Sequence, residues 1–260
     1  METQGIVKNW GNSGGILVPK EWLGKQVKVK IVERTDEIKR EVLKIVDNYL
    51  DEVQGIYLVG SYARGDQEKN SDIDIIIISE TLRKAFSSGK YHIETHSLKW
   101  IKNSLQNNPI MIYPRLNEAK TIINSSLIQE IMSDLTIKKE SFKEFIEDCR
   151  RVIAINKEYI ELDKLNGEIL ESAEAVIYSL FLRLRGIFFI KTILEERKGT
   201  KELFKNWLSE KSKMSKKQVE ELYQIYRALK DDQKIDKKIK IKDAEILLDV
   251  LGKEVKSFYA

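Results

Sequence analysis

The sequence contains little cysteine and little proline, and each shortage excludes a class of protein. One cysteine in 260 residues, Cys149, excludes a framework of internal disulfides and favours a reducing, cytoplasmic setting. The three prolines all lie at or before position 114, and nine of the 13 glycines lie in the first 89 positions. Because proline and glycine interrupt helices, the second half of the chain is predicted to form long helices.

Long hydrophobic runs and a large excess of one charge are missing too. The longest apolar stretch, Ala175–Leu194, contains three basic residues, and Met1–Val7 lacks the layout of a signal peptide, so we expect no membrane association. The net charge of +4 is small for a protein that coats nucleic acid. Residues 1–34, 35–137 and 138–260 carry +3, −3 and +4. An acidic middle segment suits a site for metal ions and phosphate groups.

These three segments are also the expected domains. Residues 35–137 are predicted to form an α+β domain with a sheet of at least three strands, and residues 138–260 an all-α bundle. Residues 1–34 are predicted to form a short β-α-β element, which is too small to fold alone. Its expected parts are a strand at Ile6-Val7, a turn at Gly11–Gly15, an apolar run at Ile16–Val18, a helical turn at Glu21–Leu23 and a strand at Val27–Ile31.

Hydrophobic periodicity places the remaining elements along the chain. In the middle segment the expected helices are Asp36–Tyr49, a short one near Tyr62–Arg64, Lys99–Gln106, and a stretch from Pro109 to about Leu135, and the expected strands are Gly55–Val59, Asp72–Ile78 and Tyr91–Leu98. In the last segment apolar stripes predict helices over Phe142–Ile153 and Val176–Phe188, followed by Lys201–Ser209, Lys216–Leu229 and Lys242–Tyr259.

One constellation of polar residues predicts chemistry. Asp72 and Asp74 are separated by one residue at the start of an expected strand, so their carboxylates point to the same face. Such a pair repels unless a divalent cation lies between the groups, and Mg²⁺ commonly takes one or two carboxylates plus substrate phosphates. Upstream, the turn Gly60-Ser61 offers backbone N–H groups and a hydroxyl to phosphates. Together they predict a site for a nucleoside triphosphate with Mg²⁺.

The same residues resemble a known family. Gly-Ser-Tyr-Ala-Arg-Gly-Asp at 60–66, with Ser-Asp-Ile-Asp at 71–74 and an isoleucine run, resembles the defining motif of the polymerase-β-like nucleotidyltransferase superfamily, over about residues 38–125. The family usually adds a third carboxylate on a neighbouring strand, and Glu94 is the candidate within Tyr91–Leu98. The resemblance assigns Gly60, Ser61, Arg64 and Ser71 to the nucleotide, and Asp72, Asp74 and Glu94 to metal binding and catalysis.

The reaction that the resemblance implies is attack of an acceptor hydroxyl on the α-phosphorus of a nucleoside triphosphate, with ATP expected. Pyrophosphate leaves, and two Mg²⁺ ions, or Mn²⁺, stabilise the attacking and leaving oxygens. The acceptor stays open: a small hydroxylated molecule, a protein side chain or an RNA end. The rival prediction is a DNA-binding regulator or antitoxin-like protein whose core binds nucleotide without turnover. Glu94 facing Asp72 and Asp74 favours catalysis, and Glu94 turned away favours the rival.

Two further groups of residues leave alternatives open. His92, Glu94 and His96 share one strand face, which could hold zinc, contact nucleotide or acceptor, or end the strand. Arg183 and Arg185 lie on a strongly apolar helix, where they could form ion pairs within the bundle or contact the acceptor or phosphate.

The N-terminal segment carries a second resemblance. Trp10–Lys20 resembles the first half of AbrB-type swapped-hairpin transcription factors, and is similar to a short archaeal domain found beside transposon genes. This resemblance implies a homodimer that exchanges strands and binds DNA through basic residues; a dimerising or docking role without DNA is the alternative. The expected DNA contacts are Lys8, Lys20, Lys25, Lys28 and Lys30. The Lys-, Glu- and Ile-rich composition leans towards a thermophile or an archaeon.

Overall fold

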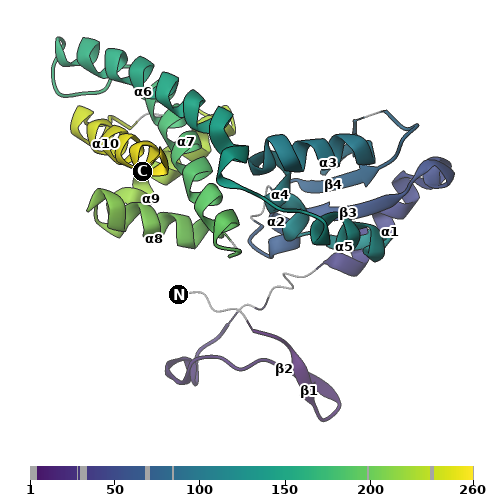
Figure 1. Ribbon diagram of the computed structural model, residues 1–260. Coiled ribbons are helices and arrows are strands. Elements are labelled where there is room, and N and C mark those ends of the chain that lie inside the picture. Colours follow the sequence, from purple (N-terminus) through teal and green to yellow (C-terminus); the bar gives the residue numbers. More distant parts are fainter. Residues whose placement is uncertain are drawn as a thin grey trace. The chain divides into compact units, whose positions relative to one another are not determined.

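A computed structural model divides the chain into two compact units, residues 1–34 and 35–260 (Figure 1). The structure describes residues 5–27, 29, 34–67, 71–83, 85–197, 199–234 and 237–259.

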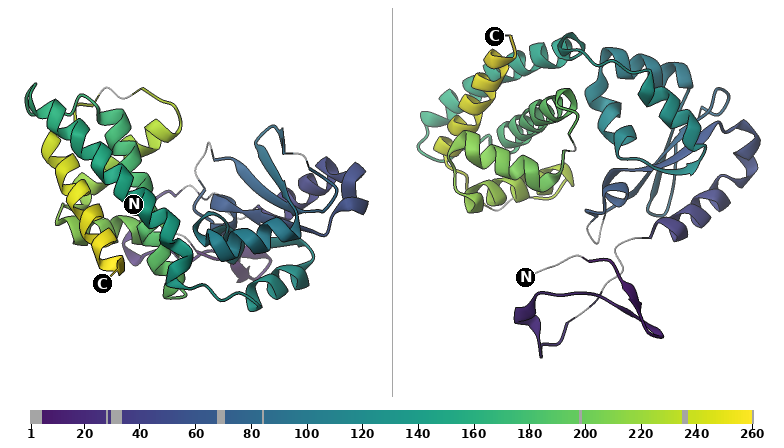
Figure 2. Two further views of the ribbon diagram at one scale, coloured as in Figure 1. Left: turned by 45° about the horizontal axis from the view of Figure 1, so that its top comes forward. Right: turned by 60° about the horizontal axis from the view of Figure 1, so that its bottom comes forward.

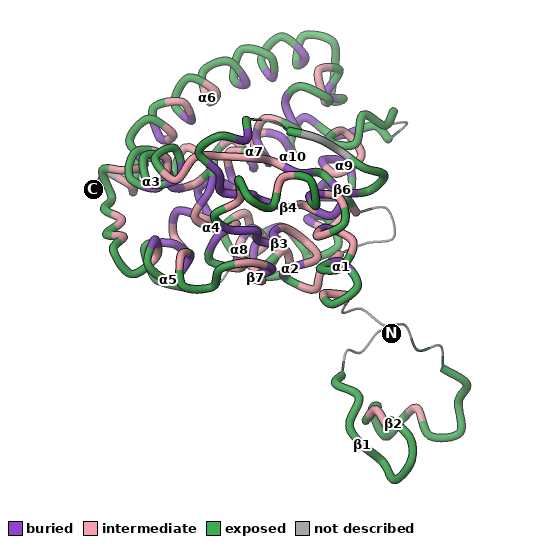
Figure 3. The backbone as a smooth tube through the Cα atoms, turned by 90° about the vertical axis from the view of Figure 1, so that its right-hand side faces the viewer, coloured by how far each residue is buried: buried purple, intermediate pink, exposed green. Residues whose placement is uncertain are grey.

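The first unit is a small hairpin. Strands β1 (Lys8–Trp10) and β2 (Ser13–Gly15) pair antiparallel around a turn in which Gly11 has a φ of 59°. A single 3₁₀ turn, Lys20–Trp22, follows Pro19. None of residues 5–27 is buried, and in Figure 3 this part of the tube is almost entirely in the colour of exposed residues.

The hairpin differs in detail from the predicted strand positions. The expected strand at Ile6-Val7 begins instead at Lys8, and the second strand lies within the expected glycine turn. Val27 and Val29 are not in a strand, and the rest of the expected strand Val27–Ile31, with Lys28 and Lys30, lies outside the described residues. Alternating valines do not form a strand unless another strand supplies the hydrogen bonds.

The second unit is built on a five-stranded mixed sheet. Its order is β5-β6-β4-β3-β7, with β4 and β6 parallel and the other pairs antiparallel. The strands are β3 (Gly55–Val59), β4 (Ile73–Ile78), β5 (Phe86–Ser88), β6 (Tyr91–His96) and β7 (Lys120–Ile123). The α+β class and the mixed sheet are therefore confirmed.

Strand β7 corrects one prediction. A helical stretch was expected to run from Pro109 to about Leu135, but the chain forms α4 (Pro109–Asn117), then β7, then α5 (Ser125–Ser133). Three consecutive β-branched residues follow Lys120, and Asn124 ends the strand with a φ of 64°, a conformation that asparagine tolerates. The strand thereby extends the sheet beside β3.

Helices cover both faces of the sheet (Figure 2). On one face α1 (Thr35–Ile45) and α2 (Gly60–Arg64) pack on the side chains of Ile56, Leu58, Ile73, Ile75, Ile77 and Ile93. On the other face α3 (Leu98–Asn107), α4 and α5 pack on Tyr57, Val59, Ile76 and Ile78. A 3₁₀ turn, Asp47–Glu52, takes the place of the last turn expected for the first helix. Because side chains alternate along a strand, one buried strand supplies both cores.

The remaining helices form a bundle, as expected. They are α6 (Lys143–Lys164), α7 (Ala173–Leu194), α8 (Lys201–Ser212), α9 (Lys216–Lys230) and α10 (Ile241–Tyr259), preceded by a 3₁₀ turn at Lys139–Phe142. They enclose a third core around α7. Among the helices that the structure describes, none combines the length and apolarity that a bilayer crossing requires.

The two arginines on α7 have partners inside the bundle. Arg183 forms an ion pair of 2.6 Å with Asp148, and Arg185 donates a 2.8 Å hydrogen bond to the hydroxyl of Tyr226. Of the two alternatives for these arginines, the structure supports the contacts within the bundle.

Candidate active site

The glycine turn and the strand carboxylates meet at the start of β4. Gly60 follows β3 with a φ of 70°, and a Cβ atom there would collide with Oδ2 of Asp74. Gly65 closes α2 with a φ of 81°. Position 60 therefore requires glycine for two reasons: glycine adopts the left-handed conformation without strain, and its missing side chain leaves room for the Asp74 carboxylate.

Register and burial give the direction of the two aspartates. Asp74 lies opposite Val59 of β3 on one side and opposite His92 of β6 on the other. Since Ile73 and Ile75 fill one core, Asp74 points to the opposite face, and Asp72 directly precedes β4 close enough to act on the Asp74 carboxylate. The Asp74 side chain is 35% exposed. Burial raises its pKa, and the nearby Asp72 and Glu94 raise it further, while Arg115 and His92 lower it.

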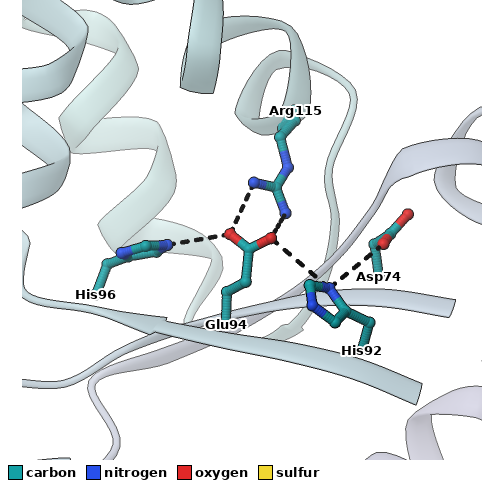
Figure 4. Close-up of polar contacts among 5 residues, drawn as sticks. All are labelled: Asp74, His92, Glu94, His96 and Arg115. Carbon is teal, nitrogen blue, oxygen red and sulfur yellow. Dashed lines mark hydrogen bonds and ion pairs between the residues drawn. The ribbon is translucent and has the colours of Figure 1, made fainter. Parts of the chain in front are cut away.

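Glu94 lies on the same face of the sheet and is held on several sides (Figure 4). Its oxygens accept hydrogen bonds from both terminal nitrogens of Arg115, at 2.8 and 2.9 Å, and His96 Nε2 lies 3.2 Å away. His92 Nδ1 lies 3.7 Å from Glu94 and 3.8 Å from Asp74, so it stands between the two carboxylates. The hydrogen bond to His96 and the ion pair with Arg115 lower the Glu94 pKa to about 2, against the opposing effect of burial.

The other residues assigned to the nucleotide lie around the turn. Arg64, on α2, pairs with Asp66 and Glu118, each at 3.2 Å. Burial lowers the pKa of Arg64, but these two carboxylates raise it above its ordinary value. Arg64 thus ties α2 to the end of α4. Ser71 directly precedes Asp72, before β4 begins.

The structure thus brings together Asp74, Gly60 and the side chains of His92, Glu94 and His96 on one face of β6. It also adds one residue, Arg115, that the sequence did not reveal. Arg115 lies 21 positions after Glu94 on a different element. Sequence patterns indicate which residues are neighbours on one helix or on paired strands. A single arginine that follows a proline belongs to no such pattern, so its partner on the sheet could not be predicted. Its bidentate pairing is the feature that identifies it.

Among the described residues, no group of three or more His, Cys, Asp or Glu side chains is arranged to hold a metal ion. A Mg²⁺ ion, however, is commonly held by one or two carboxylates with phosphates completing its shell. Asp74, beside the glycine turn, and the nearby Asp72 fit that smaller set.

Comparison with known proteins places the chain in a family. The family model described as nucleotidyltransferase domain matches residues 36–246. The chain belongs to this family, and membership supports nucleotide binding and the transfer of nucleotidyl groups as its general activity. A second family, described as a putative transposon-encoded protein, matches residues 3–35.

Individual relatives are more distant. A putative protein adenylyltransferase of Methanocaldococcus jannaschii is 32% identical over 103 residues, which are 40% of this chain and 93% of the relative. Among solved structures, a spectinomycin adenyltransferase of Enterococcus faecialis with ATP and spectinomycin has a TM-score of 0.42 and 16% identity, covering 86% of this chain and all of that one. A nucleotidyltransferase-like protein of Exiguobacterium sibiricum has a TM-score of 0.39 and 11% identity, covering 85% of this chain and 75% of that one.

Proposed function

We propose that the protein transfers a nucleoside monophosphate, AMP from ATP, to a hydroxyl group and releases pyrophosphate. The observation that carries the proposal is the close approach of the Asp74 carboxylate to the backbone of Gly60, with Glu94 on the adjacent strand. A carboxylate pair beside a turn that presents backbone N–H groups is the arrangement that a metal-bound triphosphate needs. The family match is consistent with it.

In this proposal each residue has a role. The acceptor oxygen attacks the α-phosphorus, the bond from that phosphorus to the bridging oxygen breaks, and pyrophosphate leaves with the electron pair. Two Mg²⁺ ions, when bound, would neutralise charge on the attacking and leaving oxygens. Asp72 and Asp74 would hold the metal, and Gly60 and Ser61 would bind the triphosphate. Arg64 and Ser71 are proposed to contribute to binding of the nucleotide, less than Gly60 and Ser61 do.

Glu94 is proposed as the third carboxylate, on the side of the acceptor. The order of the strands supports this side, because β3 and its turn lie on one flank of β4 and β6 lies on the other. In-line displacement places the attacking and leaving oxygens on opposite sides of the phosphorus. If pyrophosphate leaves toward the turn after β3, the acceptor approaches along β6, beside Glu94, and the hydroxyl proton would pass to solvent.

For the acceptor we propose a protein side-chain hydroxyl. The support is the relative from M. jannaschii, which is named a putative protein adenylyltransferase and which this chain matches over 93% of its length. A small hydroxylated molecule and an RNA end are the other outcomes of the same assay.

The test is transfer of label. The protein is incubated with each α-³²P-labelled nucleoside triphosphate, with Mg²⁺ or Mn²⁺ and cell lysate, and the labelled product is digested with protease or nuclease. We expect label from ATP in a protease-sensitive product, and none with the double variant Asp72→Ala/Asp74→Ala. A protein that binds ATP but labels nothing with any nucleotide would instead support the rival, a regulator with a non-catalytic core.

The N-terminal unit is a separate proposal. The match to a transposon-associated family covers residues 3–35, and the described lysines Lys8, Lys20 and Lys25 are all exposed. Either DNA binding or a dimerising or docking role fits these facts. Titration of a duplex at two salt concentrations tests the first, because neutralised phosphates make affinity fall as salt rises. Light scattering tests for a homodimer.

A further inference from the structure

Arg115 is a charged residue beside the proposed site to which neither the motif nor the comparisons assign a role. Its two terminal guanidinium nitrogens donate to the two oxygens of Glu94, a parallel arrangement that fixes both distance and orientation. The side chains of Arg115 and Glu94 are 28% and 26% exposed. A pair that is three-quarters buried holds its geometry better than the exposed ion pairs of this protein.

The helix that carries Arg115 is fixed from two directions. Ile112 and Leu116 of α4 are buried in the core against the sheet. Ile110 and Tyr113 of the same helix pack against the core of the helical bundle. The backbone that positions the guanidinium therefore depends on both cores.

The local backbone of α4 adds a constraint. Pro109 occupies the first turn of the helix, where its missing N–H costs nothing, and Pro114 lies inside the helix directly before the arginine. Pro114 has no N–H to donate to the preceding turn, and its ring fixes φ. The arginine is thus attached to a stretch of backbone with few alternative conformations.

We propose that Arg115 is a positioning residue, which holds the Glu94 carboxylate beside Asp74 and sets the position of that group for transfer. This inference rests on the proposed function, since it gives a role within the same site. Both terminal nitrogens are engaged by Glu94, so Arg115 does not present its fork to a phosphate. Glu94 would otherwise be pushed away from Asp74 and Asp72 by like charge, because carboxylates on one face repel.

The competing role for Arg115 is direct binding of the triphosphate. The two roles differ in the kinetic constant that they affect. A residue that acts through Glu94 changes kcat and leaves the affinity for ATP alone, whereas a phosphate ligand changes the affinity. They also differ in additivity, because two residues that act as one unit lose their effect only once.

The experiment is a double-mutant cycle with Arg115→Met, Glu94→Gln and the combined variant. Arg115→Lys keeps the charge without the planar fork, and Arg151→Met, on the surface of α6, is the control. ATP affinity is measured by calorimetry with Mg²⁺ present, and kcat by transfer from labelled ATP to the acceptor fraction that the wild type labels. Urea unfolding of the same proteins measures the ion pair without turnover.

We expect Arg115→Met to lower kcat on the order of 10²-fold, as a misplaced group does, and to change ATP affinity by less than about twofold. Arg115→Lys should recover part of the loss, and the combined variant should be no slower than Glu94→Gln. In urea, the two single variants should be non-additive by about tenfold in the unfolding equilibrium constant. Arg151→Met should behave as wild type.

Other results would overturn the proposal, and they separate it from the proposed function. If the wild type transfers label but Arg115→Met loses ATP affinity with kcat kept, Arg115 is a phosphate ligand. Multiplicative losses of kcat in the cycle would mean that it acts independently of Glu94. If the wild type transfers no label, the proposed function fails first, and coupling in urea alone would reduce the Arg115–Glu94 pair to a structural role.

Discussion

The apolar side chains of residues 5–27 are not buried, whereas those of residues 35–259 form three buried cores. In the first unit Trp10 and Leu17 are 70% and 76% exposed, and none of the described residues is buried. In the second unit Phe181 is fully buried among other aromatic rings, and two more cores lie on the faces of the sheet. Both segments have apolar residues at regular spacing, so spacing alone does not make a core.

The difference lies in how many layers the chain can bring together. A buried face needs a second layer, and within the described residues of the first unit the two three-residue strands have none to pack against. The second unit has helices on both faces of its sheet and a bundle beside it. We therefore expect chemistry and stability to reside in the second unit, and the following predictions test that division.

The largest effect is expected at the carboxylate pair of the second unit. Asp74→Asn should reduce nucleotide transfer by at least about 10³-fold, comparable to the loss of a major electrostatic group. Transfer from labelled ATP measures it. Asp249→Asn, an exposed aspartate on α10 that pairs with Lys253, is the control and should keep full activity. An active Asp74→Asn variant would show that the reaction does not depend on this carboxylate.

The next effect concerns the one thiol. Burial in the bundle raises the pKa of Cys149 to about 12. The reactive thiolate is therefore scarce, and alkylation at pH 8 should be on the order of 10³-fold slower than for an exposed thiol. The variant Leu17→Cys adds a thiol in the first unit, which should react at the rate of an exposed thiol. Its alkylation rate should level off above about pH 9, where an ordinary thiol is mostly ionised, while Cys149 stays slow. Equal rates at the two positions would contradict the difference in burial between the two units.

A smaller effect separates the units by stability. Phe181→Ala should cost about 3–5 kcal/mol in urea unfolding, the usual range for a buried phenylalanine. Trp10→Ala should change stability by less than about 0.5 kcal/mol, because an exposed side chain loses few contacts. A large cost for Trp10→Ala that grows with protein concentration would show that a second copy of the chain covers the hairpin.

The smallest effect is expected on removing the first unit altogether. A chain that begins at Thr35 should melt within about 2 °C of the full chain, since less than about 0.5 kcal/mol of its stability would be lost. Its rate of transfer should stay within about twofold. A loss of transfer with an unchanged melting temperature would instead assign the hairpin to acceptor binding.

The parts of the site that the sequence predicts are those encoded by short spacings. Asp72 and Asp74 are separated by one residue at the start of β4, and Gly60 directly follows β3, so a short motif in the sequence marks all three residues. The pairing of β3 with β4 then brings Gly60 beside Asp74. Arg115 depends on how α4 packs, and its contact with Glu94 follows from tertiary structure alone. For the same reason β7 was mistaken for helix, because its identity depends on pairing with β3.

The bundle also has a consequence for the order in which the chain folds. All three prolines lie at or before position 114, so α6 to α10 contain no X–Pro bond. In an unfolded chain about 10–30% of such bonds become cis and return slowly, over tens of seconds. Helices with mainly local contacts form far faster than that. The bundle should therefore recover its helical circular dichroism within seconds of dilution from denaturant, and any slower phase belongs to residues that precede it.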